Sequence, residues 1–155
     1  MGLRPATELI SAGRLICRRE QQRLAPLIPG VELRLTGGSS LPGALTGGDI
    51  DLHCRVVGDF HAAVRVLTGL YVRVKVDLWG PTLATFEVPD ELPVGLAATP
   101  VNSEHDTFFL RSWAALAADP QLLEDYNALK RKYHGSDEYD AMKAEFFGRL
   151  GGYSS

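Results

Sequence analysis

Apolar and polar residues alternate along several stretches of residues 31–101, and a period of two is typical of strands with one buried face. The pattern predicts strands at residues 31–36, 49–57, 71–78, 83–88 and 94–101. In the second of these, one face carries Ile50, Leu52, Cys54 and Val56, and the other carries Asp49, Asp51, His53 and Arg55. That strand is therefore expected to present two carboxylates on the side away from its apolar face.

Helical spacing of apolar residues predicts the remaining elements. A first helix is expected over residues 6–24, a short one over 60–67, and a helical turn near 41–45. Three further helical runs follow Ser103, with apolar stripes at Phe109, Trp113 and Leu116, then Leu122, Tyr126, Leu129 and Tyr133, then Tyr139, Met142, Phe146 and Leu150. Ser103 and Ser136 are expected N-caps. The aromatic stripes are expected to be core rather than a cofactor pocket.

Strands followed by helices indicate an α+β fold rather than a regular βαβ repeat. We expect a mixed β-sheet core over about residues 31–101, flanked by helices, with closing helices over 103–150 packed on it. A chain of 155 residues has the size of one ordinary domain, so we expect a single domain over residues 1–155.

Composition narrows the setting and the partners. A net charge of −3 supplies no broad basic field, which disfavours a nucleic-acid acceptor. No apolar run reaches the roughly 18 residues of a membrane span, and no apolar stretch follows the N-terminus as in a signal peptide. Cys17 and Cys54 lack the spacing of a metal or redox motif. We therefore expect a cytoplasmic protein with reduced thiols and no membrane partner.

The stretch 37–52 carries the candidate chemistry. A Gly-Gly-Ser-Ser segment is followed by Asp49 and Asp51, which strand alternation places on one face, about 7 Å apart along the backbone. Paired carboxylates suit a hard divalent cation, Mg²⁺ or Mn²⁺, that also binds phosphates. Gly38, Ser39 and Ser40 offer a close backbone approach and hydroxyl donors to phosphate oxygens. The alternative is a turn in which the aspartates cap backbone groups. Two aspartates on one apolar strand, however, repel each other without a cation.

These residues resemble the signature of the polymerase-β-like nucleotidyltransferase superfamily, with Gly38-Ser39 and then Asp49 and Asp51. The resemblance implies that the Gly-Ser turn holds a triphosphate and that the Asp pair holds metal ions. A closer resemblance is to the GrpB family, and it extends over residues 33–147. It is carried by Gly38-Ser39-Ser40-Leu41-Pro42-Gly43-Ala44, by Tyr126-Asn127-Ala128-Leu129-Lys130-Arg131, by Arg111 with Asp119-Pro120, and by the run 139–147.

The superfamily implies a third carboxylate from a later strand. Asp77 and Glu87 are the two candidates, and the alternative is that no third carboxylate reaches the site. We expect Glu87 to be the catalytic one. Gly95 stands where related sequences can carry an acid. Nucleotide binding is expected from Arg73 and Lys75, on the strand face of Asp77, and from Lys130; Lys143 also matches a family lysine. His53, next to Asp51 on its face, is a possible contact. Each of these also has a plainer reading as a solvated surface residue.

The expected function is metal-dependent transfer of a nucleoside monophosphate from a nucleoside triphosphate to a small-molecule acceptor. Mg²⁺ or Mn²⁺ would be the cofactor, and Asp49, Asp51 and Glu87 the catalytic residues. The main alternative is a catalytically weak or inactive nucleotide-binding module of the same fold, and a further one is a phosphate-ester enzyme with the same metal site. The run 103–106 is not a catalytic triad, because adjacent residues do not converge on one substrate atom.

Overall fold

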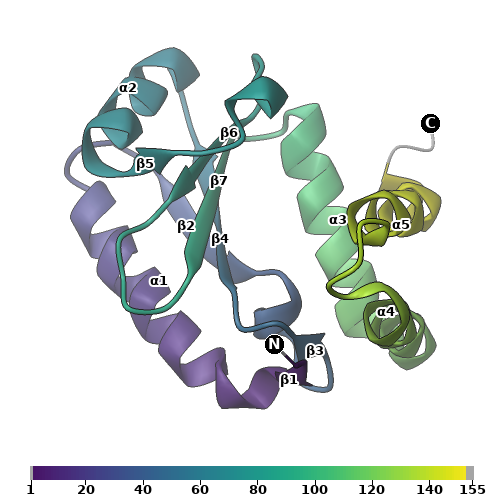
Figure 1. Cartoon of the computed structure of the whole chain (residues 1–155). Coiled ribbons are helices and arrows are strands. Elements are labelled where there is room, and N and C mark those ends of the chain that lie inside the picture. The colour runs from purple at the N-terminus through teal and green to yellow at the C-terminus, as the bar shows by residue number, and fades with distance from the viewer. Residues whose placement is uncertain (1, 153–155) are drawn as a thin grey trace.

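The computed structural model describes residues 2–152. Its centre is a five-stranded mixed sheet in the order β2-β4-β7-β6-β5 (Figure 1). The strands are β2 (Glu32–Thr36), β4 (Ile50–Val56), β7 (Val94–Pro100), β6 (Ala84–Glu87) and β5 (Val72–Arg73). β4 and β7 run parallel, and the other neighbours are antiparallel. A small second sheet pairs β1 (Arg4–Pro5) with β3 (Leu45–Thr46). The mixed sheet confirms the α+β expectation.

One face of the sheet is covered by α1 (Ile10–Leu24) and α2 (Phe60–Leu70) (Figure 1). The alternate apolar residues of the strands point into this layer, so the core below the sheet includes Leu33, Leu52, Cys54, Phe86 and Leu96. Asp59 begins α2 by accepting a hydrogen bond from the backbone N–H of Ala62. The strand pattern read from the sequence therefore fixes which face of the sheet is apolar.

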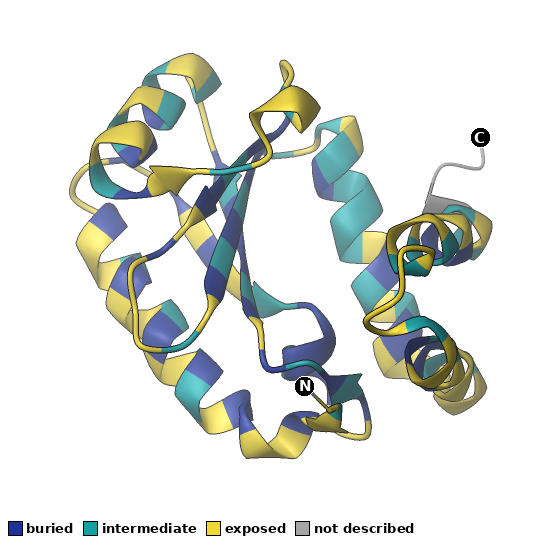
Figure 2. Cartoon of the chain, viewed as in Figure 1, coloured by how far each residue is buried: buried dark blue, intermediate teal, exposed yellow. Residues whose placement is uncertain are grey.

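The other face lies toward α3 (Glu104–Ala118), with α4 (Pro120–Tyr133) and α5 (Tyr139–Phe147) beyond it (Figure 1). A second cluster of buried residues, called the helical core below, contains Ala6, Leu41, Ala44, Leu116, Tyr126, Phe146 and Phe147. Figure 2 shows buried positions in all three of these helices among exposed ones. The prediction that the aromatic stripes are core is confirmed for Leu116, Tyr126 and Phe146, whereas Phe109 lies outside both core clusters and lines a cleft. The Ser103 N-cap is confirmed as well, since its side chain accepts from Asp106 N–H.

Three local predictions are wrong. The stretch 71–78 is a strand only at β5; Lys75 then takes a left-handed conformation at φ 50°, and Val76–Leu78 form a 3₁₀ helix. The carbonyl of Val74 accepts from Trp79 Nε1 and Thr85 Oγ1, which turns the chain out of the sheet. The turn expected at 41–45 is instead a 3₁₀ helix at Gly38–Ser40 followed by β3. α5 begins after Glu138, not at Ser136.

Within residues 2–152, no helix is both long and apolar enough to cross a bilayer.

Candidate functional site

The strand register sets Asp51 in a row of residues on one side of the sheet. Asp51 of β4 pairs with Thr36 of β2 and with Gly95 of β7, and Gly95 pairs with Glu87 of β6. Directly opposite residues project to the same side of a sheet. Asp51 and Glu87 therefore share the face that looks toward α3, called the site face below, with Gly95 between them.

A cleft of about 360 Å³ opens between the site face and the closing helices. Asp51, Gly37 and Gly95 line it from the sheet, Lys75 from the turn after β5, and Lys143 from α5. The pKa of the Asp51 carboxyl is raised, chiefly by burial, and the neighbouring Asp49 charge raises it further. Lys143, Lys130 and Lys75 act in the opposite direction and lower it. Asp51 is thus a half-buried acid whose ionisation is opposed by burial and favoured by the charges of three lysines.

Asp49 lies just before β4 and is exposed. Its charge acts on both Asp51 and Lys130, so the two aspartates and that lysine form one electrostatic group. Within the described residues, no group of three or more His, Cys, Asp or Glu side chains is placed to hold a metal ion. Two carboxylates supply hard oxygen ligands, and Mg²⁺ ordinarily completes its shell with water and substrate phosphates. The donor chemistry of Asp49 and Asp51 therefore fits a divalent cation.

Gly37, which sequence reasoning did not single out, makes the closest approach to the Asp51 carboxylate. A Cβ on Gly37 would overlap Asp51 Oδ2, and its φ of 76° also favours glycine. Gly38 is constrained differently, because a Cβ there would overlap the ammonium of Lys130. Glycine is therefore required at 37 by its backbone conformation, whereas at 38 a side chain would displace the Lys130 ammonium from its place against the loop. The signal in the sequence was the doubled glycine itself, of which only the second was interpreted.

The serine hydroxyls of the loop bond to the protein itself. Ser39, whose hydroxyl was expected to donate to phosphate oxygens, is buried. Its Oγ donates to the carbonyl of Asp49 and lies 2.7 Å from Thr46 Oγ1. Ser40 Oγ donates to the carbonyl of Gly37 at 2.6 Å. These bonds tie the loop to the start of β4. Ser39 and Ser40 thus have a structural role in the loop, and their phosphate-binding role stays a prediction.

Helix α4 holds the chain between the serines and the aspartates. Asn127 Oδ1 accepts from the backbone N–H of Leu45 at 2.8 Å, and its Nδ2 donates to the carbonyl of Gly43 at 2.9 Å. Lys130 Nζ donates to the carbonyl of Leu45 at 2.5 Å. One face of α4 therefore satisfies three backbone groups of the loop that leads into the acidic pair. Asn127 was quoted only as part of the 126–131 run.

Lys130 is buried beneath the loop. Its Nζ lies 4.3 Å from the centroid of the Tyr126 ring. Burial, and after it the charge of Lys143, lower the pKa of Lys130 to about 8, while Asp51 and Asp49 act to raise it. The ammonium is thus partly desolvated and faces both carboxylates. A desolvated ammonium interacts more strongly with an anionic ligand than a surface lysine does.

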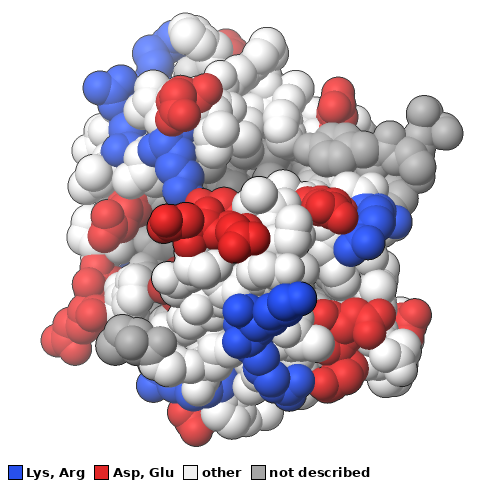
Figure 3. Space-filling view, turned by 45° about the vertical axis from the view of Figure 1, so that its right-hand side comes forward, with Lys and Arg blue, Asp and Glu red and all other residues white. Residues whose placement is uncertain are grey.

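Other predicted site residues lie farther away. Arg73 pairs in register with Phe86, which belongs to the core below the sheet, so the register places Arg73 on the face opposite to Asp51. Asp77 lies exposed on the 3₁₀ helix after Lys75. In the face shown in Figure 3, Lys and Arg side chains form separate small groups among acidic ones and no continuous basic band. The lysines around Asp51 are therefore a local feature of the cleft.

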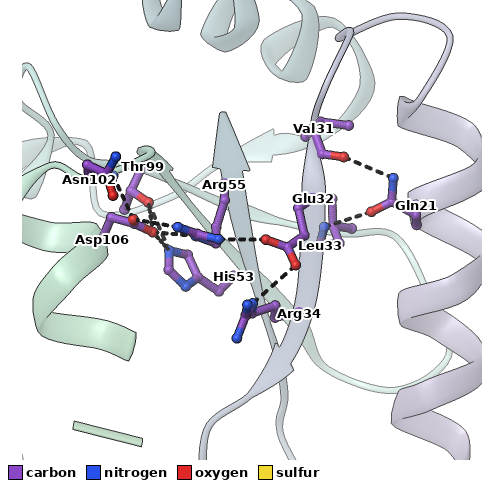
Figure 4. Close-up of polar contacts among 10 residues, drawn as sticks. All are labelled: Gln21, Val31, Glu32, Leu33, Arg34, His53, Arg55, Thr99, Asn102 and Asp106. Atoms are coloured by element: carbon purple, nitrogen blue, oxygen red, sulfur yellow. Dashed lines mark hydrogen bonds and ion pairs between the residues drawn. The ribbon is translucent and has the colours of Figure 1, made fainter. Parts of the chain in front are cut away.

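A buried polar network joins the site face to the start of α3 (Figure 4). Asp106 accepts two hydrogen bonds from Arg55, at 2.8 Å and 3.0 Å, and one from the backbone N–H of Asn102. His53 Nε2 lies 2.8 Å from Thr99 Oγ1 and 3.3 Å from Asp106 Oδ1. Burial raises the pKa of Asp106, but these bonds to Arg55 and Asn102 outweigh it and lower the pKa overall. The network fixes α3 against β4 and β7.

The same network continues toward the sheet edge (Figure 4). Arg55 Nη1 donates to Glu32 Oε1 at 2.6 Å, and Arg34 lies 3.4 Å from the other oxygen of Glu32. On the far side of the edge strand β2, Gln21 of α1 accepts from Leu33 N–H and donates to the Val31 carbonyl. These contacts satisfy backbone groups and pair charges along the edge strand β2, and none of them involves Asp51.

Burial of His53 predicts an acid-sensitive fold. Burial, against the attraction of Asp106, lowers the pKa of His53 to about 4 from 6.5. The unfolded chain then binds more protons below pH 6.5, so this contribution to stability is complete above 6.5 and is lost as pH falls toward 4. The loss is expected to reach roughly 2–4 kcal/mol. Urea unfolding from pH 7 to pH 4 should show this slope in wild type and a shallower one in His53→Gln. His61→Gln, on the surface of α2, should keep the wild-type slope; equal slopes in all three proteins would contradict the assignment.

Comparisons with known proteins agree with this arrangement. No protein-family model matches the chain. A UPF0157 protein from Vibrio cholerae serotype O1 is 31% identical over 137 residues, which cover 86% of this chain and 72% of the relative. Conserved protein GrpB from Enterococcus faecalis superposes with a TM-score of 0.69 at 17% identity, over 90% of this chain and 92% of the other.

A more distant likeness is to the fold of a nucleotide-bound polymerase. The Cid1 poly(U) polymerase, in a structure with magnesium and 3′-dATP bound, superposes with a TM-score of 0.50 at 14% identity. The match covers 78% of this chain and 40% of the polymerase chain, so the chain corresponds to less than half of that enzyme. The fold is thus nucleotidyltransferase-like, as the Gly-Ser and Asp-x-Asp pattern implied.

Proposed function

The chain belongs to the UPF0157 (GrpB) family, and from this premise we propose that it is a metal-dependent nucleotidyltransferase acting on a small-molecule acceptor. The observation that carries the proposal is the cleft lined by Asp51, Lys75 and Lys143, in which the charges of Asp49 and of the buried Lys130 also act on Asp51. A divalent cation would pair with the two carboxylates, and the phosphates of a nucleoside triphosphate would pair with the lysines.

In this proposal the acidic residues bind the metal ion and the lysines bind the phosphates. Asp49 and Asp51 would hold Mg²⁺ or Mn²⁺, which when bound neutralises charge on the reacting phosphates. Lys75 and Lys143 line the cleft and would donate charge-assisted hydrogen bonds to phosphate oxygens. Lys130, beneath Gly38, adds a fixed positive charge below the loop. The narrow backbone at Gly37 and Gly38 keeps these groups close together.

Glu87 is the best candidate in this chain for the base that activates the acceptor. It lies on the site face in the row of Asp51, and Gly95 between them carries no side chain. A Cβ at Gly95 would lie 3.5 Å from Asp51 Oδ1, so an acid there would have met Asp51 directly. We assign Glu87 to accept the proton of the acceptor hydroxyl or amine as that atom attacks the α-phosphorus. The bond from the α-phosphorus to the bridging oxygen breaks, and pyrophosphate leaves.

The same row supports the second candidate function, a nucleotide-binding module with weak or no catalysis. Glu87 is exposed and two strands away from Asp51, and neighbouring strands are about 4.8 Å apart. Because β7 lies between β6 and β4, the Glu87 carboxylate reaches the metal site only if its side chain extends along the sheet across β7. In that case the lysines and the acidic pair bind a nucleotide, and the acceptor is not activated.

The test of the proposed function measures binding and chemistry separately. The purified protein is titrated with ATP, GTP, CTP and UTP in the presence of Mg²⁺ or Mn²⁺, and pyrophosphate release is followed over a panel of hydroxyl and amine acceptors. Metal-dependent release with one acceptor supports the enzyme. Binding without release over the whole panel supports the module. No metal-dependent binding of any triphosphate refutes both.

Lys75 offers a substitution that separates binding from stability. Its left-handed backbone at φ 50° costs a residue with a side chain about 1 kcal/mol, which glycine avoids. Lys75→Gly is therefore expected to leave the free energy of unfolding unchanged or slightly higher, and to weaken triphosphate binding roughly tenfold by removing a charged donor. Asn102→Gly is the matched control, because Asn102 is also left-handed at φ 69° and lies outside the cleft lining. Calorimetric titration and melting curves of both variants check this; equal triphosphate affinity in the two would remove Lys75 from the site.

A further inference from the structure

The cleft has a second half that the acids and lysines leave unused. Around His53 it is lined by Ala97 from the sheet and by Phe109 from α3. His53 follows Asp51 by two residues on the same strand face, about 7 Å farther along the sheet. The Phe109 ring is half-buried and meets the His53 ring edge-to-face at 5.2 Å. This part of the cleft therefore carries two aromatic rings, and it belongs to the same cavity as Asp51 and the lysines.

His53 contributes an unpaired acceptor to this apolar end. Thr99 Oγ1 donates its one proton to Asp106 Oδ1, so the same hydroxyl can only accept from the ring. Nε2, which also faces the Asp106 carboxylate at 3.3 Å, therefore carries the proton of the neutral imidazole. The other ring nitrogen, Nδ1, is left with a bare lone pair.

Nδ1 has no hydrogen-bond partner among residues 2–152, although His53 is only 2% exposed. It is also not sealed off, because Ser112 Oγ is the single fully enclosed side-chain nitrogen or oxygen without a partner in the described chain. His53 lines the cleft, so the lone pair is available to a ligand there. By contrast, Thr85 Oγ1 already donates to the Val74 carbonyl and accepts from Trp79 Nε1.

We propose that this aromatic end of the cleft, with Phe109 as its wall and His53 Nδ1 as its acceptor, binds the nucleobase of the nucleotide. The inference rests on the proposed function and names the part of the nucleotide that the charged end does not take. Each common nucleobase is a planar ring with at least one N–H group that can donate to Nδ1, and its faces stack on aromatic side chains. The spacing from Asp51 to His53 is one that a ribose can span. Contacts to His53 and Phe109 should therefore make a nucleotide bind more tightly than a polyphosphate without a base.

The test compares a nucleoside triphosphate with inorganic tripolyphosphate, which carries the phosphates without a base. Calorimetric titrations with Mg²⁺ use ATP, UTP and tripolyphosphate against wild type, Phe109→Leu and His53→Gln. The Gln amide keeps a donor toward Thr99 but lacks the Nδ1 lone pair. Phe108→Leu is the matched control, since Phe108 is the adjacent residue of α3 and packs against the helical core. Wild type should bind nucleotides roughly tenfold or more tighter than tripolyphosphate.

In Phe109→Leu and His53→Gln this preference should fall toward unity while tripolyphosphate affinity stays, and Phe108→Leu should keep it. Equal affinity of wild type for nucleotides and tripolyphosphate would overturn the base site and leave the proposed function standing. Parallel loss of both ligands in the two variants would show that the residues act only through the fold, and would also overturn the inference. If wild type binds neither ligand, the proposed function fails first.

Discussion

Replacing Asp51 by Asn is expected to abolish metal-dependent nucleotide binding and turnover while making the protein more stable. The pKa of this carboxyl is raised mainly by burial, so its ionised form is disfavoured in the folded protein, and a neutral amide removes that penalty. The amide also removes a negative ligand from the cation. Since groups that merely orient metal ligands are worth 10–100-fold, loss of the ligand itself should cost at least about a hundredfold.

The measurement combines melting curves, with and without Mg²⁺ and ATP, with the pyrophosphate assay. Wild type should melt higher when both ligands are present, by mass action, and Asp51→Asn should not respond. Asp77→Asn is the matched control, because Asp77 is exposed on the 3₁₀ helix after Lys75. A ligand-induced shift in Asp51→Asn equal to that of wild type would place the metal elsewhere.

Asn127→Leu is expected to have the largest effect on stability. The change leaves the N–H of Leu45 and the carbonyl of Gly43 without their partners at 2.8 Å and 2.9 Å. An unpaired buried backbone group costs about 1–3 kcal/mol, and this applies to the half-buried Leu45 N–H, whereas the exposed Gly43 carbonyl can turn to water. The free energy of unfolding should therefore fall by roughly 1–3 kcal/mol. The loop between the serines and Asp49 should also lose its fixed position, which should weaken triphosphate binding in the fraction that remains folded.

Gln121→Leu is the control for this change. Gln121 is an exposed amide in the same helix, and its side chain donates to Asp125 on the surface. That substitution should alter stability by less than about 0.5 kcal/mol. Urea unfolding of both variants, followed by titration of the folded proteins with ATP and Mg²⁺, gives the comparison. Similar small losses for the two variants would mean that α4 does not hold the loop.

The sequence was most informative where contacts are local. In β4 the alternation of Leu52 and Cys54 with Asp51 and His53 gave the strand and its two faces, because a period of two follows directly from strand geometry. The same reasoning failed at Lys75. Val72 and Val74 continue the alternation, yet Trp79 and Thr85 capture the Val74 carbonyl and turn the chain. A pattern of residues does not reveal which side chain will take a backbone group.

The acidic residues of the site could be predicted from the sequence, but the residues that position them could not. Asp49 and Asp51 followed from a motif of adjacent residues. The partners that position them come from far along the chain, as Asn127 does at 82 residues from Leu45. Gly37 was passed over because its role depends on where the Asp51 carboxylate lies, which only the sheet register shows. Long-range pairing of this kind has no signature in a single sequence.

The bond between Leu45 and Asn127 gives the molecule an internal reporter. Leu45 pairs with Pro5 in the small sheet, but its amide hydrogen is held by a side chain of α4 and not by a strand. Exchange of this hydrogen for deuterium therefore requires α4 to lift from the loop, or the whole protein to unfold. The difference between its exchange rate and that of a central β4 amide measures how often the cleft comes apart. That frequency can be read in the free protein, before any ligand or reaction has been identified.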